Sequence, residues 1–148
     1  MGLAAGAVSA QDFPTRPVKI VVPAAAGGPT HITAQLLADK MQVLLGQPVI
    51  VEPRPGAGNN LGAEVVARSA PDGYTLLVSY SGYHVGNPHL FKQSGWDPVK
   101  DFAPVAMMTR APQVIAVSPK LPVNNLKELI AFAKANPGKL NYASSGNG

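Results

Sequence analysis

The amino-acid sequence predicts an α/β protein built around a largely parallel β-sheet. Runs of β-branched residues alternate along the chain with stretches whose apolar residues recur at helical spacing. Turns rich in Gly and Pro separate these segments, and the 148 residues include 15 of each. The chain is 46% hydrophobic and 14% charged, which is typical of a globular protein with a core. Because strand–turn–helix units repeat, we expect parallel strands with helices on the faces of the sheet.

The first unit begins with the stretch RPVKIVVPA, residues 16–24, which has the β-branched run of a buried strand. The turn AAGGPT follows it. Apolar residues then recur every three or four positions over 30–45, and this spacing predicts a helix. Thr30 is the expected N-cap of the helix, and Gly46, with a proline two residues later, is the expected end.

The second and third units repeat this order. The stretch PVIVE, residues 48–52, predicts a strand that enters the turn PRPGAGNN. A helix is expected over 61–69, with Asn59 or Asn60 as its N-cap. A third strand is expected over 74–80, and it opens into the stretch SGYHVGNPHL. We interpret the beginning of that stretch as a turn.

The last third of the chain predicts three more strands and one helix. Strand-like runs occupy 104–109, 113–118 and 139–143. Asn125, with Glu128 at the third helical position, resembles a capping box, so a helix is expected to begin after Asn125. The following Asn-Pro-Gly sequence should end it.

Three turns lie where ligands bind in such sheets, at the carboxyl ends of strands. They span 26–30, 79–84 and 143–148. At a helix N-terminus, backbone N–H groups and the helix dipole favour an anion, and glycines let a ligand approach the main chain closely. The same residues also suit ordinary helix-capping turns, so the sequence alone leaves both interpretations open.

The sequence lacks the residues that several classes of function need. The net charge of +4 comes from isolated cations without a basic run, so we expect no nucleic-acid partner. The sequence has no Cys, no G-x-S-x-G motif and no H-E-x-x-H motif. His31 stands alone, and His84 and His89 are five residues apart, which does not place both on one helical face. We therefore expect no catalytic residue, no metal and no cofactor.

One glycine-rich turn suggests an alternative function. Residues 56–62 follow a strand and open a helix, as a dinucleotide-binding fingerprint does. Their spacing, however, is G-x-G-x-x-x-G, and the next strand ends in Ser79 and Tyr80 rather than in an acid that could bind a ribose. Because of these mismatches, a nucleotide-dependent α/β enzyme is only the alternative interpretation of this turn.

The first ten residues resemble the end of a secretory signal peptide. Residues 1–10 contain a short run of small apolar residues that closes on Val8-Ser9-Ala10, which fits an A-x-A-like cleavage pattern. A cationic segment before the run is missing, and an Ala/Gly tail is the other interpretation. No stretch approaches the roughly 18 consecutive apolar residues of a membrane span, so we do not expect a membrane-embedded protein.

Five longer phrases resemble one family. They are PVKIVVPAAAGGPT, GQPVIVEPRPGAGNNLGAEVVARSAPDGYTLL, NPHLFK, WDPVKDFAPVA and KLNYASSGNG. Together they resemble the Bug family, the periplasmic substrate-binding proteins of tripartite tricarboxylate transporters, over about Asp12 to Gly148. The resemblance implies a periplasmic-binding-protein-like fold of type II, in which two lobes close on a small carboxylate without catalysis. The hinge would lie near Arg110 to Pro112.

The resemblance also implies domains, location and partners. Residues 11–111 would form the first lobe and 112–148 the start of the second. The protein would be periplasmic and, at full length, monomeric. It would pass a small carboxylate to the membrane permease subunits of the transporter or report it to a sensor. Family members carry a complete second lobe, so we expect a truncated reading frame or fragment, and a non-functional truncated product is a further alternative.

The candidate ligand-binding residues follow from the same resemblance. In the family, the turn after the first strand and the turn at 143–148 hold a carboxylate between them. Where the family commonly has Asp, this chain has His31, which replaces a negative group by a neutral or cationic one. The implied residues are Gly27, Gly28, Thr30 and His31 in the first turn, Ser81, Tyr83 and His84 after the third strand, and Ser144, Ser145, Gly146 and Asn147 in the last turn.

Overall fold

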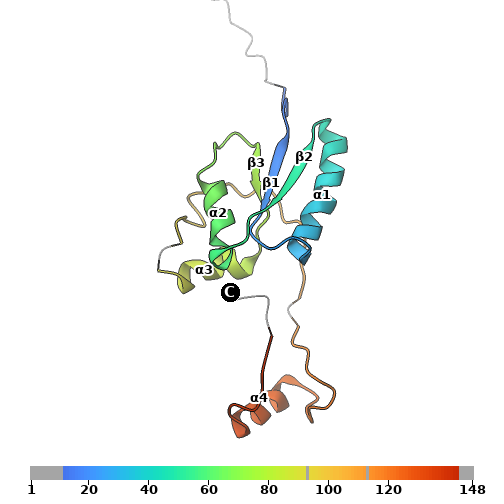
Figure 1. The fold of residues 1–148 in the computed structure, drawn as a ribbon, viewed down its shortest axis with the longest axis vertical. Coiled ribbons are helices and arrows are strands. Elements are labelled where there is room, and N and C mark those ends of the chain that lie inside the picture. The colour runs from blue at the N-terminus through green and yellow to red at the C-terminus, as the bar shows by residue number, and fades with distance from the viewer. Residues whose placement is uncertain (1–11, 93, 113, 144–148) are drawn as a thin grey trace, which may run out of the picture. The chain divides into compact units, whose positions relative to one another are not determined.

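The computed structural model describes residues 12–92, 94–112 and 114–143, which fall into two compact units that divide between Ala103 and Pro104. In the first unit, three strands form one parallel sheet in the order β2–β1–β3 (Figure 1). Its elements are β1 (Val18–Val22), α1 (Pro29–Leu45), β2 (Val49–Pro53), the 3-10 turn η1 (Ala57–Asn59), α2 (Asn60–Ala67), β3 (Thr75–Leu77) and α3 (Ser81–Leu90). The predicted α/β class with a parallel sheet is confirmed.

β1 is the central strand, and one of its faces forms the core of the first unit. Val18, Ile20 and Val22 are at most 1% exposed. They pack against Ala34 and Ala38 of α1, whose small side chains let the helix lie close to the sheet. Each square ångström of apolar surface removed from water contributes about 25 cal/mol, so this face anchors α1 firmly on β1.

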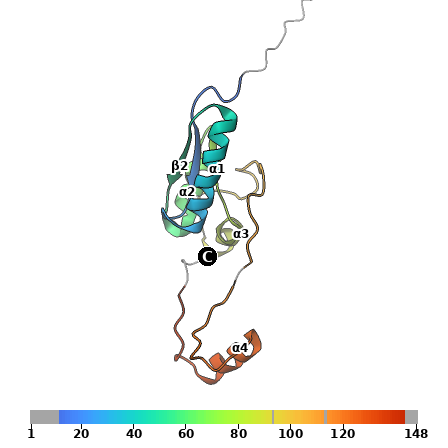
Figure 2. The ribbon, with the colours of Figure 1, turned by 90° about the vertical axis from the view of Figure 1, so that its right-hand side faces the viewer.

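α2 packs on the opposite face of the sheet. Gly62 lies so close to the end of β1 that a Cβ atom there would be 2.8 Å from Pro23 Cα. The chain moves from β1 to β2 on one side of β1 and then crosses to β3 on the other side. Right-handed crossovers in these two directions place α1 and α2 on opposite faces (Figure 2).

The helix boundaries differ in part from those predicted. The N-cap of α1 is Gly28 rather than Thr30, because Pro29 takes the first helical position, where its fixed φ and missing N–H are tolerated. α1 ends at Gly46 in the left-handed conformation, as predicted. Asn59 is the N-cap of α2, one of the two residues predicted, but within the described structure its side chain makes no capping hydrogen bond.

The stretch after β3 is a helix, where the sequence predicted a turn over 79–84. α3 runs Ser81–Leu90 and contains Pro88. Pro88 supplies no N–H for the His84 carbonyl four residues earlier, and the helix ends two residues later at Leu90. Phe91 N–H still donates to the Asn87 carbonyl at 2.9 Å. The candidate residues of this stretch therefore lie on the first turn of a helix.

The second unit contains α4 (Leu126–Ala135). The Asn125 Oδ1 atom accepts from Glu128 N–H at 3.0 Å, and the Glu128 carboxylate accepts from Asn124 N–H at 2.7 Å. The first bond satisfies an orphan donor of the first turn, as predicted, whereas the Glu128 carboxylate accepts from the residue before the N-cap rather than from the N-cap N–H of a strict capping box. Of the helices in residues 12–92, 94–112 and 114–143, not one combines the length and the apolar character needed to cross a bilayer.

The strands predicted in the last third of the chain were wrong for the described residues. Residues 104–109, 114–118 and 139–143 are irregular, and residue 113 lies outside the described part. A β-branched run becomes a strand only when a neighbouring strand pairs with it, because strand stability comes from cross-strand bonds and side-chain pairs. The described residues of these runs have no ladder partner, so propensity alone misled the prediction.

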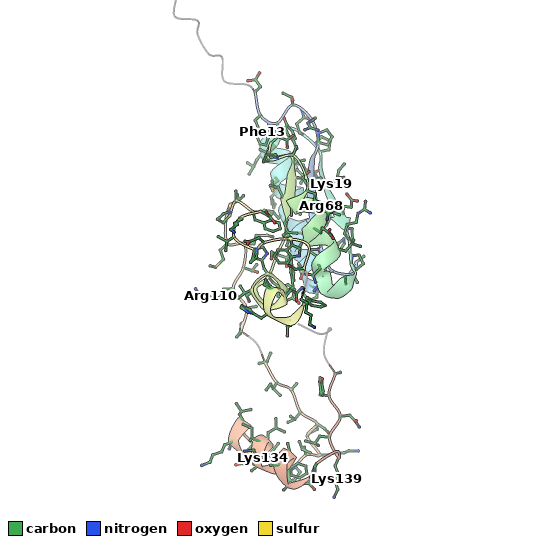
Figure 3. The ribbon with its side chains drawn as sticks, turned by 90° about the vertical axis from the view of Figure 1, so that its left-hand side faces the viewer. Phe13, Lys19, Arg68, Arg110, Lys134 and Lys139 are labelled. Atoms are coloured by element: carbon green, nitrogen blue, oxygen red, sulfur yellow. The ribbon has the colours of Figure 1, made fainter. Side chains whose placement is uncertain are left out.

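Several charged side chains on the surface of the first unit form ion pairs; Figure 3 labels two of the cations, Lys19 and Arg68. Lys19 Nζ lies 2.9 Å from the Glu52 carboxylate, which also contacts Arg54. Arg68 pairs with Glu64 one helical turn away. The hydrogen bond from Lys19 is the main cause that lowers the pKa of Glu52. Exposed pairs of this kind contribute about 0–1 kcal/mol each, so they affect charge distribution more than stability.

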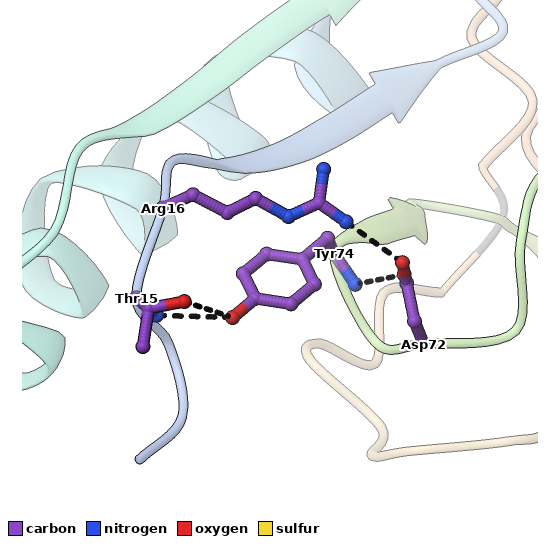
Figure 4. Close-up of polar contacts among 4 residues, drawn as sticks. All are labelled: Thr15, Arg16, Asp72 and Tyr74. Carbon is purple, nitrogen blue, oxygen red and sulfur yellow. Dashed lines mark hydrogen bonds and ion pairs between the residues drawn. The ribbon is translucent and has the colours of Figure 1, made fainter. Parts of the chain in front are cut away.

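A cluster around Tyr74 closes the amino-terminal edge of the sheet (Figure 4). Thr15 N–H donates to the Tyr74 hydroxyl at 2.9 Å, and the Arg16 guanidinium lies 4.1 Å from the ring centroid and 2.8 Å from Asp72. Hydrogen bonds from Thr15 lower the pKa of Tyr74. A cavity of about 300 Å³ adjoins this cluster. Its two cations, Arg16 and Lys19, are already paired with acids, so the cavity lacks an unpaired charge to attract an acid.

Candidate functional site

Three strands end side by side at the carboxyl edge of the sheet in the first unit. Arg54 N–H donates to the Val22 carbonyl at 2.7 Å, and Val78 N–H donates to the Val21 carbonyl at 3.0 Å. The turns after β1, β2 and β3 therefore begin at one edge. Because the chain reverses direction around β1, this edge is a topological switch point, where α/β sheets bind ligands.

The turn after β1 presents the start of α1 without a capping side chain. Gly27 has φ 83°, in the left-handed region, and Gly28 is the extended N-cap. Pro29, Thr30 and His31 form the first turn; none of them is acidic, and no described side chain caps it. α1 is 17 residues long, so orphan N–H groups and the positive end of its dipole favour an anion at this turn.

His31 braces this turn through one ring nitrogen. Gly27 N–H donates to His31 Nδ1 at 3.3 Å, so in this arrangement Nδ1 is unprotonated and Nε2 carries the ring proton. The neutral imidazole then offers a donor where a carboxylate would offer only acceptors. His31 therefore changes the chemistry of the turn as well as its charge.

α3 also begins without a cap. Its N-cap is Tyr80, no described side chain accepts from its first turn, and that turn contains no acid. Ser81 occupies the first helical position and is exposed. The Tyr80 ring lies over Gly82, where a Cβ atom would be only 2.4 Å from the ring. The α3 start thus combines orphan N–H groups, an exposed hydroxyl and an aromatic wall that the sequence had not suggested.

Tyr83 and His84 point into the protein. Tyr83 is 0% exposed, its hydroxyl donates to the Val78 carbonyl at 2.7 Å, and burial raises the pKa of its phenol. His84 Nε2 lies 3.1 Å from the Pro98 carbonyl. The His84 ring packs 5.1 Å from the rings of both Trp96 and Phe102, centroid to centroid. These predicted cleft residues therefore hold α3 in place rather than present their polar atoms at the edge.

A buried amide chain, which sequence reasoning missed, supports the same edge. Trp96 Nε1 donates to Asn60 Oδ1 at 3.1 Å, and Asn87 Nδ2 donates to that oxygen at 3.0 Å and to the Gly58 carbonyl at 2.6 Å. The bonds tie α2, α3 and the Trp96 segment together. Asn60 looked like a helix cap in the sequence, and no local pattern links it to residues 27 and 36 positions away.

Comparison with known proteins identifies the family. The family model named TctC, described as the tripartite tricarboxylate transporter family receptor, matches residues 33–148 of the chain. The chain belongs to this family.

Three solved TctC-like structures resemble the chain. Rpa4515 of R. palustris with adipate is 36% identical with a TM-score of 0.78, and the match covers 87% of this chain and 43% of that one. MatC of Rhodopseudomonas palustris with bound malate is 41% identical with a TM-score of 0.75, over 83% and 42%. The periplasmic binding protein BugD is 38% identical with a TM-score of 0.64, over 84% and 41%.

These matches confirm the family resemblance drawn from the sequence. The chain spans less than half the length of the three solved relatives, 41–43% of each. TctC-family proteins bind substrates for transport and are not enzymes. The lobe described here corresponds to part of a periplasmic binding protein, and its parallel sheet is the part that carries the candidate site.

In this TctC-family chain, packing explains the glycines at 56–62. Gly58 has φ 62°, and a Cβ atom there would be 2.6 Å from the Phe91 ring. A Cβ atom on Gly62 would be 2.8 Å from Pro23. Both positions need the missing side chain to bring protein segments together, so no feature of the turn favours a nucleotide.

Four predicted residues, Ser144, Ser145, Gly146 and Asn147, lie outside the described residues. Their part in the site therefore stays a prediction, as does the hinge at 110–112. In residues 12–92, 94–112 and 114–143, no group of three or more His, Asp or Glu side chains could hold a metal ion. Within the described part, the candidate site consists of the α1 and α3 starts.

Proposed function

We propose that this chain forms part of an extracytoplasmic solute-binding protein that captures a small dicarboxylate for a tripartite tricarboxylate-type transporter or a sensor. Its family and the relatives solved with adipate and malate support this. One observation carries the proposal: α1 and α3 begin at the ends of neighbouring strands, with no acid in either first turn and no capping side chain among the described residues.

Main-chain donors supply most of the binding energy in this proposal. Each helix terminus contributes about 0.3–1 kcal/mol of charge attraction, and each charge-assisted hydrogen bond about 1.5–3 kcal/mol. A few such bonds reach about −8 kcal/mol, which is micromolar affinity, without an arginine. The residues proposed to contact the ligand are Gly27, Gly28, Thr30, His31 and Ser81, together with Ser144, Ser145, Gly146 and Asn147.

Tyr83 and His84 have a supporting role in this proposal. Their polar atoms bond to the Val78 and Pro98 carbonyls. They therefore fix the direction in which the α3 start faces, and the ligand meets Ser81 and the main chain instead.

His31 sets the preference among small acids. The bond from Gly27 N–H holds its Nδ1 as an acceptor, so its remaining polar group is an N–H donor. A carboxylate at this position would attract a ligand ammonium group, whereas the imidazole donor attracts a second carboxylate oxygen. We expect simple dicarboxylates to bind more tightly than amino acids.

The location and partners belong to the same proposal. Residues 1–10 serve as the end of a signal peptide, and the mature protein acts in the periplasm as a monomer. Residues 11–111 form the first lobe and 112–148 the start of the second, with closure near Arg110 to Pro112. The closed form delivers its ligand to the membrane permease subunits.

Calorimetry on two proteins tests the proposal. One is the chain itself, and the other is a chimera in which the chain replaces the segment of MatC that it matches. Malate, adipate, aspartate and NAD⁺ are titrated into each. We expect micromolar binding of malate or adipate to the chimera, weaker binding of aspartate, and no binding of NAD⁺. Binding of NAD⁺ without any dicarboxylate would contradict the proposal and favour the nucleotide alternative. A lack of binding in both proteins would contradict it in favour of a non-functional product.

A matched pair of serine variants locates the site in the chimera. Ser81→Ala removes the exposed hydroxyl at the α3 start and should weaken dicarboxylate binding by about fivefold, the value of one hydrogen bond of about 1 kcal/mol. Ser69→Ala makes the same change beside the cavity at the opposite edge of the sheet and should have no effect. If Ser69→Ala weakens binding and Ser81→Ala does not, the ligand binds at the opposite edge of the sheet and the proposed site is wrong.

A further inference from the structure

α3 carries two buried acceptor atoms for which the described residues supply no donor. They are His84 Nδ1 and Asn87 Oδ1. The two residues are three apart on one helix, so their side chains lie on the same face, one turn apart. Both reach the Trp96 segment, His84 by ring packing at 5.1 Å and Asn87 through Asn60. Asn87 is 0% exposed, so bulk water does not reach its amide.

The orientation of the Asn87 amide is fixed by its neighbours. Trp96 Nε1 can only donate, so the Asn60 atom that lies 3.1 Å from it is the oxygen. The Asn87 atom 3.0 Å from that oxygen must be Nδ2, and it also lies 2.6 Å from the Gly58 carbonyl. A flipped amide would set Asn87 Oδ1 against two other acceptors. Oδ1 is therefore the amide atom that is left without a hydrogen-bond partner among the described residues.

The tautomer of His84 is fixed in the same way. Its Nε2 lies 3.1 Å from the Pro98 carbonyl, which can only accept, so Nε2 carries the proton and Nδ1 is an acceptor. The Tyr83 hydroxyl donates to Val78 instead. The Trp96 indole N–H donates to Asn60. These two donors are therefore committed elsewhere, and no described donor bonds to His84 Nδ1.

We propose that one water molecule is bound inside the first unit between His84 and Asn87. It donates one O–H to His84 Nδ1 and the other to Asn87 Oδ1. Water suits this place because it brings two donors to two acceptors, and because ordering one water is less unfavourable than leaving two buried polar atoms unpaired. The water joins two side chains of α3 that lie one turn apart, and one of them, Asn87, already bonds to Asn60 and Gly58.

A protonated His84 that donates directly to Asn87 is the competing arrangement. It needs a positive charge on the His84 ring, for which the described residues supply no ion-pair partner. The neighbouring acids are engaged elsewhere: Asp97 Oδ1 accepts from the backbone N–H groups of Val99 and Lys100 at 2.9 Å, and Asp101 accepts from Asp97 N–H at 2.7 Å. The neutral ring with a bound water is therefore the favoured arrangement.

Nuclear magnetic resonance on the 148-residue chain tests the proposal. At neutral pH, the ¹⁵N shifts of His84 should show a protonated Nε2 and an unprotonated Nδ1. Rotating-frame Overhauser cross peaks should join a long-lived water to the His84 ring and the Asn87 amide protons. A protonated Nδ1, or the lack of these cross peaks in the folded chain, would overturn the proposal.

A pair of histidine variants sharpens the test. His84→Phe keeps an aromatic ring in place but removes the acceptor, and it should abolish the water cross peaks to Asn87. His89→Phe makes the same change at an exposed position of α3 and should leave the peaks unchanged. If the His84→Phe variant does not fold, the ¹⁵N shifts and water cross peaks of the wild-type chain still test whether the water is bound. Water cross peaks that persist in a folded His84→Phe variant would contradict the proposed site.

Discussion

The first turns of α4 and α1 are built in opposite ways. At α4, Asn125 accepts from Glu128 N–H at 3.0 Å, and the Glu128 carboxylate accepts from Asn124 N–H at 2.7 Å. At α1, the N-cap is Gly28, no described side chain caps the helix, and the first turn has no acid. At α4 the Asn125 side chain already accepts from a first-turn N–H, and the Glu128 carboxylate lies in the positive field of the helix start. Of these two helix starts, the α1 start is therefore the one that favours an outside anion.

α3 belongs with α1 in this comparison. Its N-cap, Tyr80, makes no side-chain cap in the described structure, and its first turn is free of acids. Both uncapped helices follow neighbouring strands of one sheet, β1 and β3. The α4 start is therefore capped by its own side chains, whereas the α1 and α3 starts leave main-chain donors for a ligand.

The largest effect on stability is expected from adding a side chain at Gly62, where α2 packs against the end of β1. A Cβ atom at Gly62 would lie 2.8 Å from Pro23 Cα and 3.0 Å from the Arg54 carbonyl, and neither backbone group can move cheaply. Gly62→Ala should therefore lower the free energy of unfolding by about 1–3 kcal/mol, as overpacking does. Urea denaturation of the chain measures it.

Gly86→Ala is the matched control, because it makes the same change in the middle of α3. No described atom comes within 4 Å of a Cβ atom there. This variant should raise the free energy of unfolding by about 0.5–1 kcal/mol, the ordinary gain of Ala over Gly in a helix. Equal effects at both glycines would show that the α1 turn does not depend on close packing against α2.

The next effect concerns the uncapped start of α1. Gly28 has φ −73° and ψ 165°, a conformation that Asp adopts readily as an N-cap. In the MatC chimera, Gly28→Asp should raise stability by a few tenths of a kcal/mol and weaken malate binding by about tenfold, or 1.4 kcal/mol. The new carboxylate would take the donors that the ligand needs and repel the ligand. Thermal unfolding and calorimetry measure the two effects.

Gly28→Ala separates charge from size at the same position. Its Cβ atom would lie 3.4 Å from the Ala25 carbonyl, an ordinary contact. We expect Ala to weaken malate binding much less than Asp, and added salt to narrow the gap. If Ala and Asp weaken binding equally, the α1 start acts by shape and the electrostatic comparison with α4 is wrong.

The sequence predicted the elements that depend on neighbours close along the chain. The α4 capping box needs only Asn125 and Glu128, and the end of α1 needs only Gly46. The parallel sheet followed from repeated strand–turn–helix units. These features rest on local bonds and on hydrophobic spacing, which a sequence displays directly.

The elements that depend on distant residues were missed. Residues 79–84 were interpreted as a turn at the end of a strand, whereas the bonds of Tyr83 to Val78 and of Asn87 to Asn60 support a helix from Ser81. The irregular run at 104–109 was interpreted as a strand because its composition contains no information about a pairing partner. The candidate α1 start was predictable from its glycines, but the bond from Gly27 to His31 was not.

A smaller effect is expected from removing the cap of α4. Asn125→Ala deletes the acceptor for Glu128 N–H, and loss of an N-cap costs about 1 kcal/mol of helix stability. Amide hydrogen exchange in the first turn of α4 should accelerate about fivefold, the factor that corresponds to this energy. Exchange at the α1 start should not change, and an equal acceleration there would show that the two helix starts are not independent.

The smallest effect on the stability of α4 is expected from lowering the pH until Glu128 is protonated. The bond from Asn124 N–H, followed by the Asn125 amide, lowers the pKa of Glu128 below its ordinary value. Because the folded pKa is the lower one, the contribution of Glu128 to α4 is fully present above the unfolded pKa of about 4.3. It is lost as the pH falls through the depressed folded value.

Amide chemical shifts followed from neutral to acid pH measure this loss. The first turn of α4 should show a titration below the ordinary glutamate range, whereas the first turns of α1 and α3 contain no acid and should show no titration in that carboxylate range. Glu128→Gln keeps a polar side chain of the same length and should abolish the titration. A titration of equal size at the α1 start in the same carboxylate range would place an acid there, and the contrast between the two helix starts would be wrong.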